Sequence, residues 1–171
     1  MVLGFGHLIG AWIFGKSFEF LTQKRLAQLP WFFLLFGAIL PDVDLVIGWI
    51  LNLEIHRTFT HSIVFALVMG FAAFIWCTLL KEKNRTTITL ALFFGICIHI
   101  FIDLISQRGV MLFWPYEQFF SFINGFNYIS HGPLFERSAE HLTRVLKSAI
   151  FDMGLGVTWV FFLWLKKDLR L

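Results

Sequence analysis

The chain has 171 residues, of which 58% are hydrophobic and 15% are charged, and it contains 23 Phe and 7 Trp. Soluble domains are usually about 45–50% apolar and about 25% charged, so a water-soluble domain of this composition would have to expose much of its Phe. The net charge of +3 is small, and the basic residues do not alternate with aromatic residues as in a nucleic-acid groove. These features exclude an ordinary soluble domain and a nucleic-acid partner. They indicate one membrane-embedded domain over residues 1–171.

Five apolar segments follow one another along the chain. They comprise residues 2–15, 31–51, 62–80, 87–105 and 148–165. Roughly 20 helical residues cross a hydrocarbon core of about 30 Å, so the first segment is short for a span. Because lipid offers no hydrogen bonds to the backbone, spanning segments must be helices. We expect an all-α integral membrane bundle of about five spans, the second of them broken at Pro41 in the stretch PDVD.

Basic residues predict the orientation of this bundle. If the five segments alternate in direction, nine of the fourteen Lys and Arg lie on one face, in three groups: Lys16, Lys24 and Arg25; Lys81, Lys83 and Arg85; and Lys166, Lys167 and Arg170. The positive-inside rule makes that face cytoplasmic. We therefore expect a protein of the inner (cytoplasmic) membrane with its N-terminus outside and its C-terminus in the cytoplasm.

Polar residues gather on the opposite, outer side. The stretch HRTFTHS, residues 56–62, directly precedes the third segment. At about 1.5 Å per residue, Asp42, His99 and Asp103 lie roughly 16, 18 and 24 Å from the inner ends of their segments. Seven candidate metal ligands from four segments thus converge in the outer half of the membrane: His7, Asp42, Asp44, His56, His61, His99 and Asp103.

A divalent cation explains this convergence. An ionised carboxylate at membrane depth costs at least ~2.5–3.5 kcal/mol, and neighbouring carboxylates also repel one another. His99 and Asp103 share a helix face at i, i+4, whereas His56 and His61, five residues apart, are expected from a loop and a helix start. The histidines favour zinc over magnesium. Seven ligands are too many for one tetrahedral zinc with an open position, so two or more ions are expected.

The segment between the last two spans, residues 107–147, is rich in aromatic residues and in Gly and Pro turns, and it is too interrupted to span. We expect an outer-face segment that roofs the site, with His131 and His141 on its surface and not among the ligands. Asp152 is either a local helix-start group or a partner of a ligating histidine. Thr58 or Thr60 is the expected N-cap of the third span.

GAILPDVD, HRTFTHS and HIFIDLISQRGVMLFWP, together with a histidine near the N-terminus, resemble the YdjM-like family of membrane-bound, predicted metal-dependent hydrolases. That family is distantly similar to zinc-dependent phospholipase C and P1 nuclease. The resemblance runs from His7 to about Pro115 and then weakly to the last helix. It implies that the seven candidates bind metal, or that Asp44 is a water-activating base instead. The chain departs from the family's Thr-Pro type turn at Ser106-Gln107-Arg108, where Arg108 is a candidate contact for an anionic substrate.

The expected function is metal-dependent hydrolysis of a phosphoester in the membrane, such as a lipid phosphate or another lipid-linked ester, with membrane lipids as partners. Arg57 is either a bidentate phosphate contact or a surface arginine that reaches the headgroups. Hydrolysis of an amide or carboxylic ester is one alternative. Transport of divalent metal or protons is another. Transport predicts ligands spread across the membrane, whereas catalysis predicts a cluster at one depth.

Overall fold

A computed structural model describes residues 4–51, 53, 55–106, 109–123 and 139–166. Within these ranges lie six α-helices and two short 3₁₀ helices: α1 (Gly4–Thr22), α2 (Gln28–Gly37), η1 (Leu40–Asp42), α3 (Val43–Leu51), η2 (Phe59–His61), α4 (Ile63–Leu79), α5 (Arg85–Leu104) and α6 (Ala139–Leu165). Among the same residues, β-type pairing is limited to an isolated bridge between Val110 and Phe120. The all-α prediction is confirmed.

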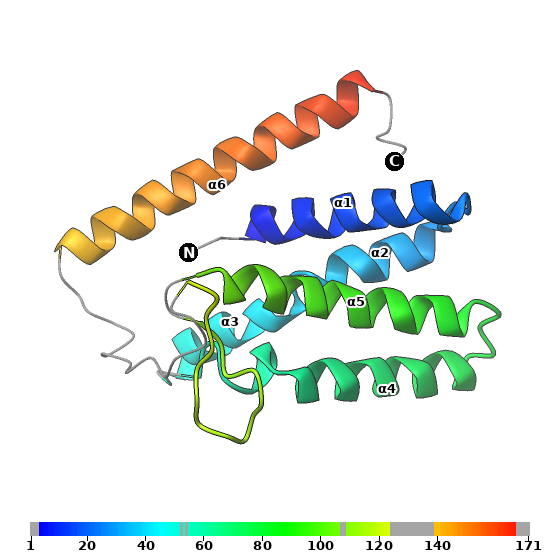
Figure 1. Cartoon of the computed structure of the whole chain (residues 1–171), viewed down its shortest axis with the longest axis horizontal. Coiled ribbons are helices and arrows are strands. Elements are labelled where there is room, and N and C mark those ends of the chain that lie inside the picture. Colours follow the sequence, from blue (N-terminus) through cyan, green and yellow to red (C-terminus); the bar gives the residue numbers. More distant parts are fainter. Residues whose placement is uncertain (1–3, 52, 54, 107–108, 124–138, 167–171) are drawn as a thin grey trace.

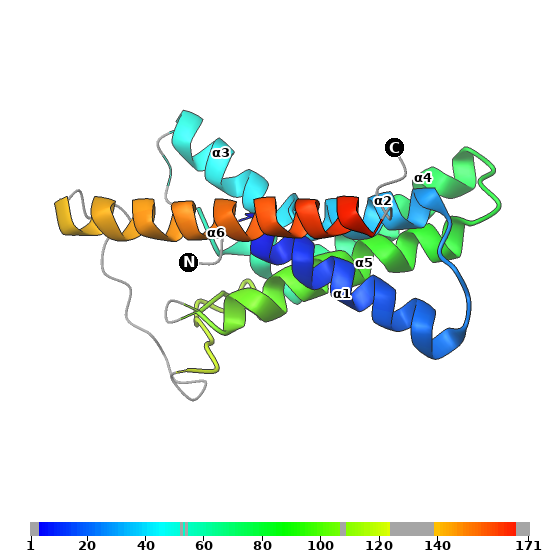
Figure 2. The same cartoon turned by 90° about the horizontal axis from the view of Figure 1, so that it is seen from above.

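The helices run back and forth along the long axis of the molecule (Figure 1). α1 runs toward one end of the molecule, α2 and α3 return, and α4 and α5 form a hairpin. α6 packs against α1 and runs in the same direction as α1 (Figures 1 and 2). The α1–α2 connection, the α4–α5 turn and the end of α6 therefore share one end of the molecule, as the predicted grouping of basic residues requires.

Two helices are long and apolar enough to cross a membrane, namely α5 and the Leu146–Leu165 part of α6. α2 and the Leu40–Gly48 helix, bent by 45° between them, make a third candidate if the pair is one span. α4 is apolar but shorter, and α1 extends beyond the expected segment to Thr22. Large apolar side chains cover much of the surface, with Leu21 78% and Val157 70% exposed, as a lipid environment allows. A bundle of five spans stays a prediction.

The predicted break at Pro41 is present. α2 ends at Gly37, and the η1 turn, in which the Asp42 amide bonds the Ile39 carbonyl at 3.2 Å, separates it from α3. Proline cannot donate a backbone hydrogen bond within a helix, and a short 3₁₀ turn accommodates it. The break brings Asp42 and Asp44 to the start of a new helix.

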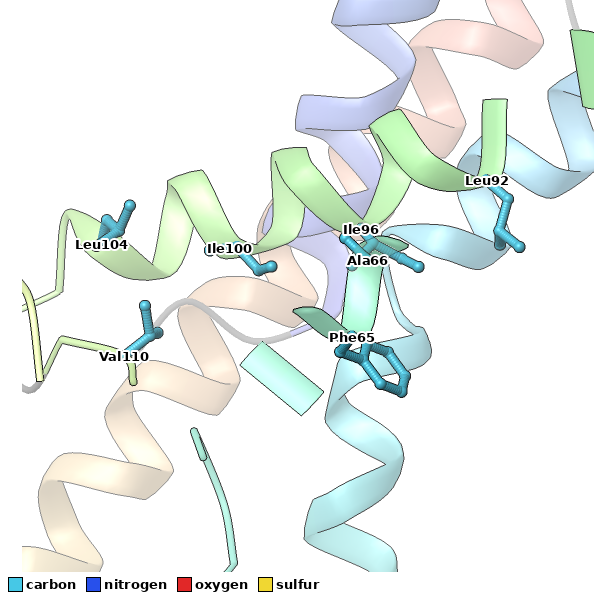
Figure 3. Packing of buried hydrophobic residues seen from close by; sticks show 7 residues of the cluster. All are labelled: Phe65, Ala66, Leu92, Ile96, Ile100, Leu104 and Val110. Carbon is cyan, nitrogen blue, oxygen red and sulfur yellow. The ribbon is translucent and has the colours of Figure 1, made fainter. Parts of the chain in front are cut away.

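One face of α5 makes the main core of the molecule (Figure 3). The buried residues of this cluster are Leu92, Ile96, Ile100 and Leu104 of α5, Phe65 and Ala66 of α4, and Val110. The α5 members recur every four residues, which aligns them along one side of a helix. His99 and Asp103 each precede a member of this row by one residue. They therefore lie about 100° around α5 from the core face.

α2 and α5 approach each other backbone to backbone at two glycines. A Cβ atom on Gly95 would lie 2.3 Å from the Leu34 carbonyl oxygen, and one on Gly37 would lie 2.5 Å from the Leu92 carbonyl oxygen. Any side chain at either position would force the helices apart. This close crossing lies one turn of α5 before His99.

Candidate metal centre

The seven side chains expected to bind metal come together from every part of the fold except α2, α4 and α6. His7 lies in the first turns of α1, Asp42 in η1, Asp44 at the start of α3, His56 in the turn after it, His61 in η2, and His99 and Asp103 in the last turns of α5. Five of them are at most 2% exposed: His7, Asp44, His61, His99 and Asp103. Their role as ligands stays a prediction, but their convergence is a property of the fold.

Two groups have the spacing that a metal ion needs. One consists of His7, His99 and Asp103, and the other of Asp42, His56 and His61. In each group, one potential ligand atom per residue lies within 4.8 Å of the others. The groups adjoin, since His61 Nε2 is 3.1 Å from His99 Nε2 and 3.5 Å from an Asp103 carboxylate oxygen.

The α2 backbone orients His99. Its Nδ1 lies 2.7 Å from the Ala38 carbonyl oxygen, which can only accept, so Nδ1 carries the proton. The Nε2 atom is then left with a lone pair that points at His61. Metal-binding histidines are commonly oriented in this way, with the second ring nitrogen donating to a carbonyl or carboxylate.

Asp44 orients the other two histidines. One of its oxygens is 2.8 Å from His56 Nδ1, and the other is 3.3 Å from His61 Nδ1. The Asp44 carboxylate also accepts hydrogen bonds from the Thr60 hydroxyl and, at 3.2 Å, from the Arg57 amide. Four donors thus surround one carboxylate. Its predicted roles as a ligand and as a base stay predictions, whereas the observed contacts make it an anchor for His56 and His61.

These contacts leave acceptor atoms facing one another. With Nδ1 of each ring bonded to an oxygen, the Nε2 lone pairs of His61 and His99 meet at 3.1 Å. A carboxylate oxygen of Asp42 lies 3.6 Å from each of the two Nε2 atoms. Lone pairs and carboxylates crowded in this way need a cation, either a proton or a metal ion. The donor set of imidazole nitrogens and carboxylate oxygens suits zinc.

The proton is the natural occupant when metal is absent. Burial opposes a charge on His61, but hydrogen bonds to Asp42 and Asp44 and the nearby carboxylates outweigh burial and raise the pKa of His61 above its ordinary value. A metal ion would have to displace that proton, so metal binding at this ring is linked to pH.

His7 contacts the face of the His99 ring. The two rings stack with centroids 3.8 Å apart, and His7 Nε2 is 3.7 Å from a carboxylate oxygen of Asp103. His7 is therefore held by α5 on one side, although it belongs to the first helix of the chain.

Arg57 is buried and bonded within the protein. Its side chain is 3% exposed, and the guanidinium donates to Asp103 at 3.0 Å, to the Ser106 hydroxyl at 2.6 Å and to the Gly109 carbonyl at 3.4 Å. The alternative of a surface arginine reaching the headgroups does not match this burial. Contact with a substrate phosphate stays a prediction. The observed role is to neutralise and orient Asp103.

The segment after α5 forms backbone hydrogen bonds with the residues around Arg57 and with the ends of α4 and α5. The Met111 amide donates to the Arg57 carbonyl at 3.0 Å, the Ile63 amide to the Leu112 carbonyl at 3.0 Å, and the Phe122 amide to the Leu104 carbonyl at 2.8 Å. Arg57 and Gly109 both have positive φ, 67° and 65°, which bends the chain where these contacts form. Residues 109–123 thus pack beside the site. Residues 107–108 and 124–138 of the expected roof, with Arg108 and His131, lie outside the described residues, as does the side chain of His141. Residues 139–147 of that expected segment form the start of α6.

Three partners of the site were missed by reasoning from the sequence. The Ala38 carbonyl has no side-chain signal, and Ser106 and Thr60 are ordinary residues that stand inside the motifs already singled out. The expected N-cap was wrong: Ser62, not Thr58 or Thr60, caps α4 by accepting from the Phe65 amide at 3.1 Å. The Thr60 hydroxyl is instead bonded to Asp44.

Asp152 follows neither of its two expected roles. Its carboxylate accepts hydrogen bonds from the Phe5 and Gly6 amides, at 3.1 and 2.9 Å, and so caps α1 from α6. It is a helix-start group, but for a different helix from its own.

The fold and the site together define a helical membrane protein with a buried centre of histidines and carboxylates. The chain belongs to the family described as YdjM inner membrane protein, which it matches over residues 1–167. It is also similar to "Uncharacterized protein YvsG" of Bacillus subtilis (strain 168), at 38% identity over 60 residues. That similarity covers 35% of this chain and 34% of the relative, about a third of its length. No solved structure matches the chain.

Proposed function

We propose that the protein is a membrane-bound, metal-dependent hydrolase that cleaves a phosphoester in or near the membrane, with a lipid phosphate or a phospholipid-like molecule as substrate. The observation that carries this proposal is the meeting of imidazoles and carboxylates from α1, η1, the turn before η2, η2 itself and α5 in two adjoining groups. Most of these residues are buried. Among the described residues, His61 and His99 bond oxygens through Nδ1, and their Nε2 atoms face each other.

His7, His99 and Asp103 would hold one ion, and Asp42, His56 and His61 a second. Zinc fits this donor set best. Two such ions would supply Lewis acidity to a phosphoryl oxygen and would lower the pKa of bound water toward 7. The chain's own residues orient the potential ligands. Asp44 holds His56 and His61, the Ala38 carbonyl holds His99, and Arg57 holds Asp103.

The distribution of buried polar groups supports catalysis over transport. Among the described residues, the buried polar or charged side chains are His7, Asp44, Arg57, His61, Ser62, His99, Asp103, Ser121 and Asp152. The α5 members lie in its last turns, while the earlier buried positions of α5, such as Ile88 and Ile96, are apolar. A transport pathway needs polar groups at successive depths. The cluster at one end of α5 supports a site reached from one side.

The test is to purify the full chain in detergent, load it with zinc, and measure bound metal and phosphate release from a panel of lipid phosphates and phospholipids. Asp42→Ala and His99→Ala should remain folded and lose both bound zinc and turnover. Zinc binding without phosphoester hydrolysis would contradict the proposed reaction. Turnover of an amide or ester panel, or zinc uptake into vesicles, would then assign one of the two alternatives.

A further inference from the structure

The last helix holds the turn of α1 that presents His7. Asp152 of α6 is 6% exposed, and both of its carboxylate oxygens accept hydrogen bonds from that turn, from the Phe5 amide at 3.1 Å and the Gly6 amide at 2.9 Å. The first amides of a helix have no partner within the helix, and a negative charge is favourable beside them. Here the cap comes from a residue 146 positions later in the chain.

Two further contacts extend this grip along α1. A Cβ atom on Gly156 would lie 2.5 Å from the Phe5 ring, so the glycine makes room for that ring. Trp159 meets Trp12 edge to face, with ring centroids 6.0 Å apart. Asp152, Gly156 and Trp159 stand at i, i+4 and i+7 and therefore share one face of α6. That face contacts α1 on both sides of His7.

The first turn of α1 needs this support. Its sequence is GFGH, and each glycine in a helix is less favourable than alanine by roughly 0.5–1 kcal/mol because it loses more backbone freedom. Helix ends without caps open readily. His7 directly follows Gly6 and has to keep its ring stacked on His99 at 3.8 Å and near Asp103.

We propose that Asp152 is a positioning residue for His7, and that α6 thereby controls metal binding by the group of His7, His99 and Asp103. This inference rests on the metal centre of the proposed function. Among the described residues, α6 contributes no member to either group of potential ligands. Its effect on metal affinity is exerted through the backbone of Phe5 and Gly6.

The experiment is a cobalt titration of the full, metal-stripped protein in detergent, followed by visible absorption and by bound cobalt per chain. Asp152→Asn removes the charge and one acceptor oxygen. It should weaken, by about tenfold or more, the same spectral component that His7→Ala abolishes. The component from Asp42, His56 and His61 should be unchanged. Asp152→Glu keeps a carboxylate and should restore part of the affinity.

Glu19→Gln is the matched control. Glu19 also links α1 to a distant backbone and side chain, accepting from the Leu26 amide at 2.8 Å and from Trp31 Nε1 at 3.1 Å, but it does so at the other end of α1. Its substitution should lower the melting temperature without changing the cobalt titration. An equal loss of cobalt affinity in Glu19→Gln would overturn the proposal, because general loosening of α1 would then suffice.

A folded Asp152→Asn protein that titrates like the wild type would overturn the inference and leave the metal centre intact. Absence of cobalt binding by the wild-type protein would overturn the metal centre and the inference together. If Asp152→Asn does not fold, hydrogen exchange on the wild-type protein tests the proposal instead. If the contact of Asp152 with α1 strengthens metal binding, metal binding must strengthen that contact, because coupling between two sites is reciprocal. Cobalt should slow exchange in residues 4–8 and 149–156, and unchanged exchange in both segments would overturn the proposal.

Discussion

At the scale of single residues, Asp44 is the anchor of the site. It accepts from His56, Arg57 and Thr60 and lies beside His61, so it fixes the stretch HRTFTHS as a unit. Carboxylates of this kind raise the metal affinity of the histidines that they orient. These contacts of Asp44 therefore hold the stretch HRTFTHS in the conformation that the structure shows.

We expect Asp44→Asn to weaken zinc binding by about 10–100-fold without unfolding the protein, because an amide cannot accept from all of these donors. Competition with a fluorescent zinc chelator measures the effect. Asp42→Asn is the comparison, since it alters a residue placed among the potential ligands. Unchanged zinc affinity in Asp44→Asn together with lost hydrolysis would instead assign Asp44 the role of base.

Arg57 neutralises Asp103 in a buried position. Removal of one partner of a buried ion pair leaves an uncompensated charge and usually costs about 3–5 kcal/mol. We therefore expect Arg57→Met to lower the free energy of unfolding of the metal-free protein by about that amount. Thermal unfolding in detergent measures it. Arg85→Met, at an exposed arginine, should change the melting point little, and equal losses in the two variants would contradict the buried-pair interpretation.

At the scale of helices, the crossing of α2 and α5 determines where His99 lies. The two backbones are in contact at Gly37 and Gly95, and the Ala38 carbonyl that orients His99 follows directly. The core face of α5 packs on α4 at the same time. His99 and Asp103 are thus placed by packing on two sides of one helix.

Gly95→Ala should separate α2 from α5, because the new Cβ would lie 2.3 Å from the Leu34 carbonyl oxygen. Overpacking of this kind costs about 1–3 kcal/mol. We expect a lower melting temperature and a loss of zinc binding as the bond from His99 to Ala38 breaks. Gly70→Ala is the control, since its nearest contact, Phe93, would lie 3.7 Å away. Equal tolerance of both substitutions would argue against a tight crossing.

At the scale of the whole molecule, the basic residues and the cluster of histidines and carboxylates lie at opposite ends. The ends of α1, α4 and α6 bring the described members of the three basic groups to one end, while the histidines and carboxylates gather toward the other (Figure 1). The positive-inside rule predicts that the basic end is cytoplasmic, and the histidines and carboxylates would then lie toward the outer side.

Cysteine labelling tests this orientation and the number of spans. In a Cys77→Ala, Cys97→Ala background, Lys24→Cys and Lys83→Cys should react with a membrane-impermeant maleimide only after the cells are permeabilised. The reason is that five spans with the N-terminus outside place both positions in the cytoplasm. A cysteine at Glu117, which is exposed, should react in intact cells. Labelling of the Lys83→Cys and Glu117→Cys variants from the same side of the membrane would contradict the five-span arrangement.

The sequence by itself determined the class of fold and the set of histidines and carboxylates that come together in it. Uncharged apolar segments in lipid have to be helical, so the all-α architecture and the break at Pro41 followed from composition and from one proline. Ionisable residues are costly at membrane depth, so Asp42, His99 and Asp103 stood out without any structure. His56 and His61 were found because polar residues preceding a long apolar segment are unusual.

Only the tertiary structure decided how these residues divide into two groups and what holds them. The hydrogen bonds of the Ala38 carbonyl, of the Arg57 guanidinium and of the Asp152 carboxylate join residues that are between 46 and 147 positions apart. Spacing along a chain reports which residues share a helix face, but contacts between helices depend on how their surfaces fit, as at Gly37 and Gly95. For that reason the clustered histidines and carboxylates were visible in the sequence and the residues that orient them were not.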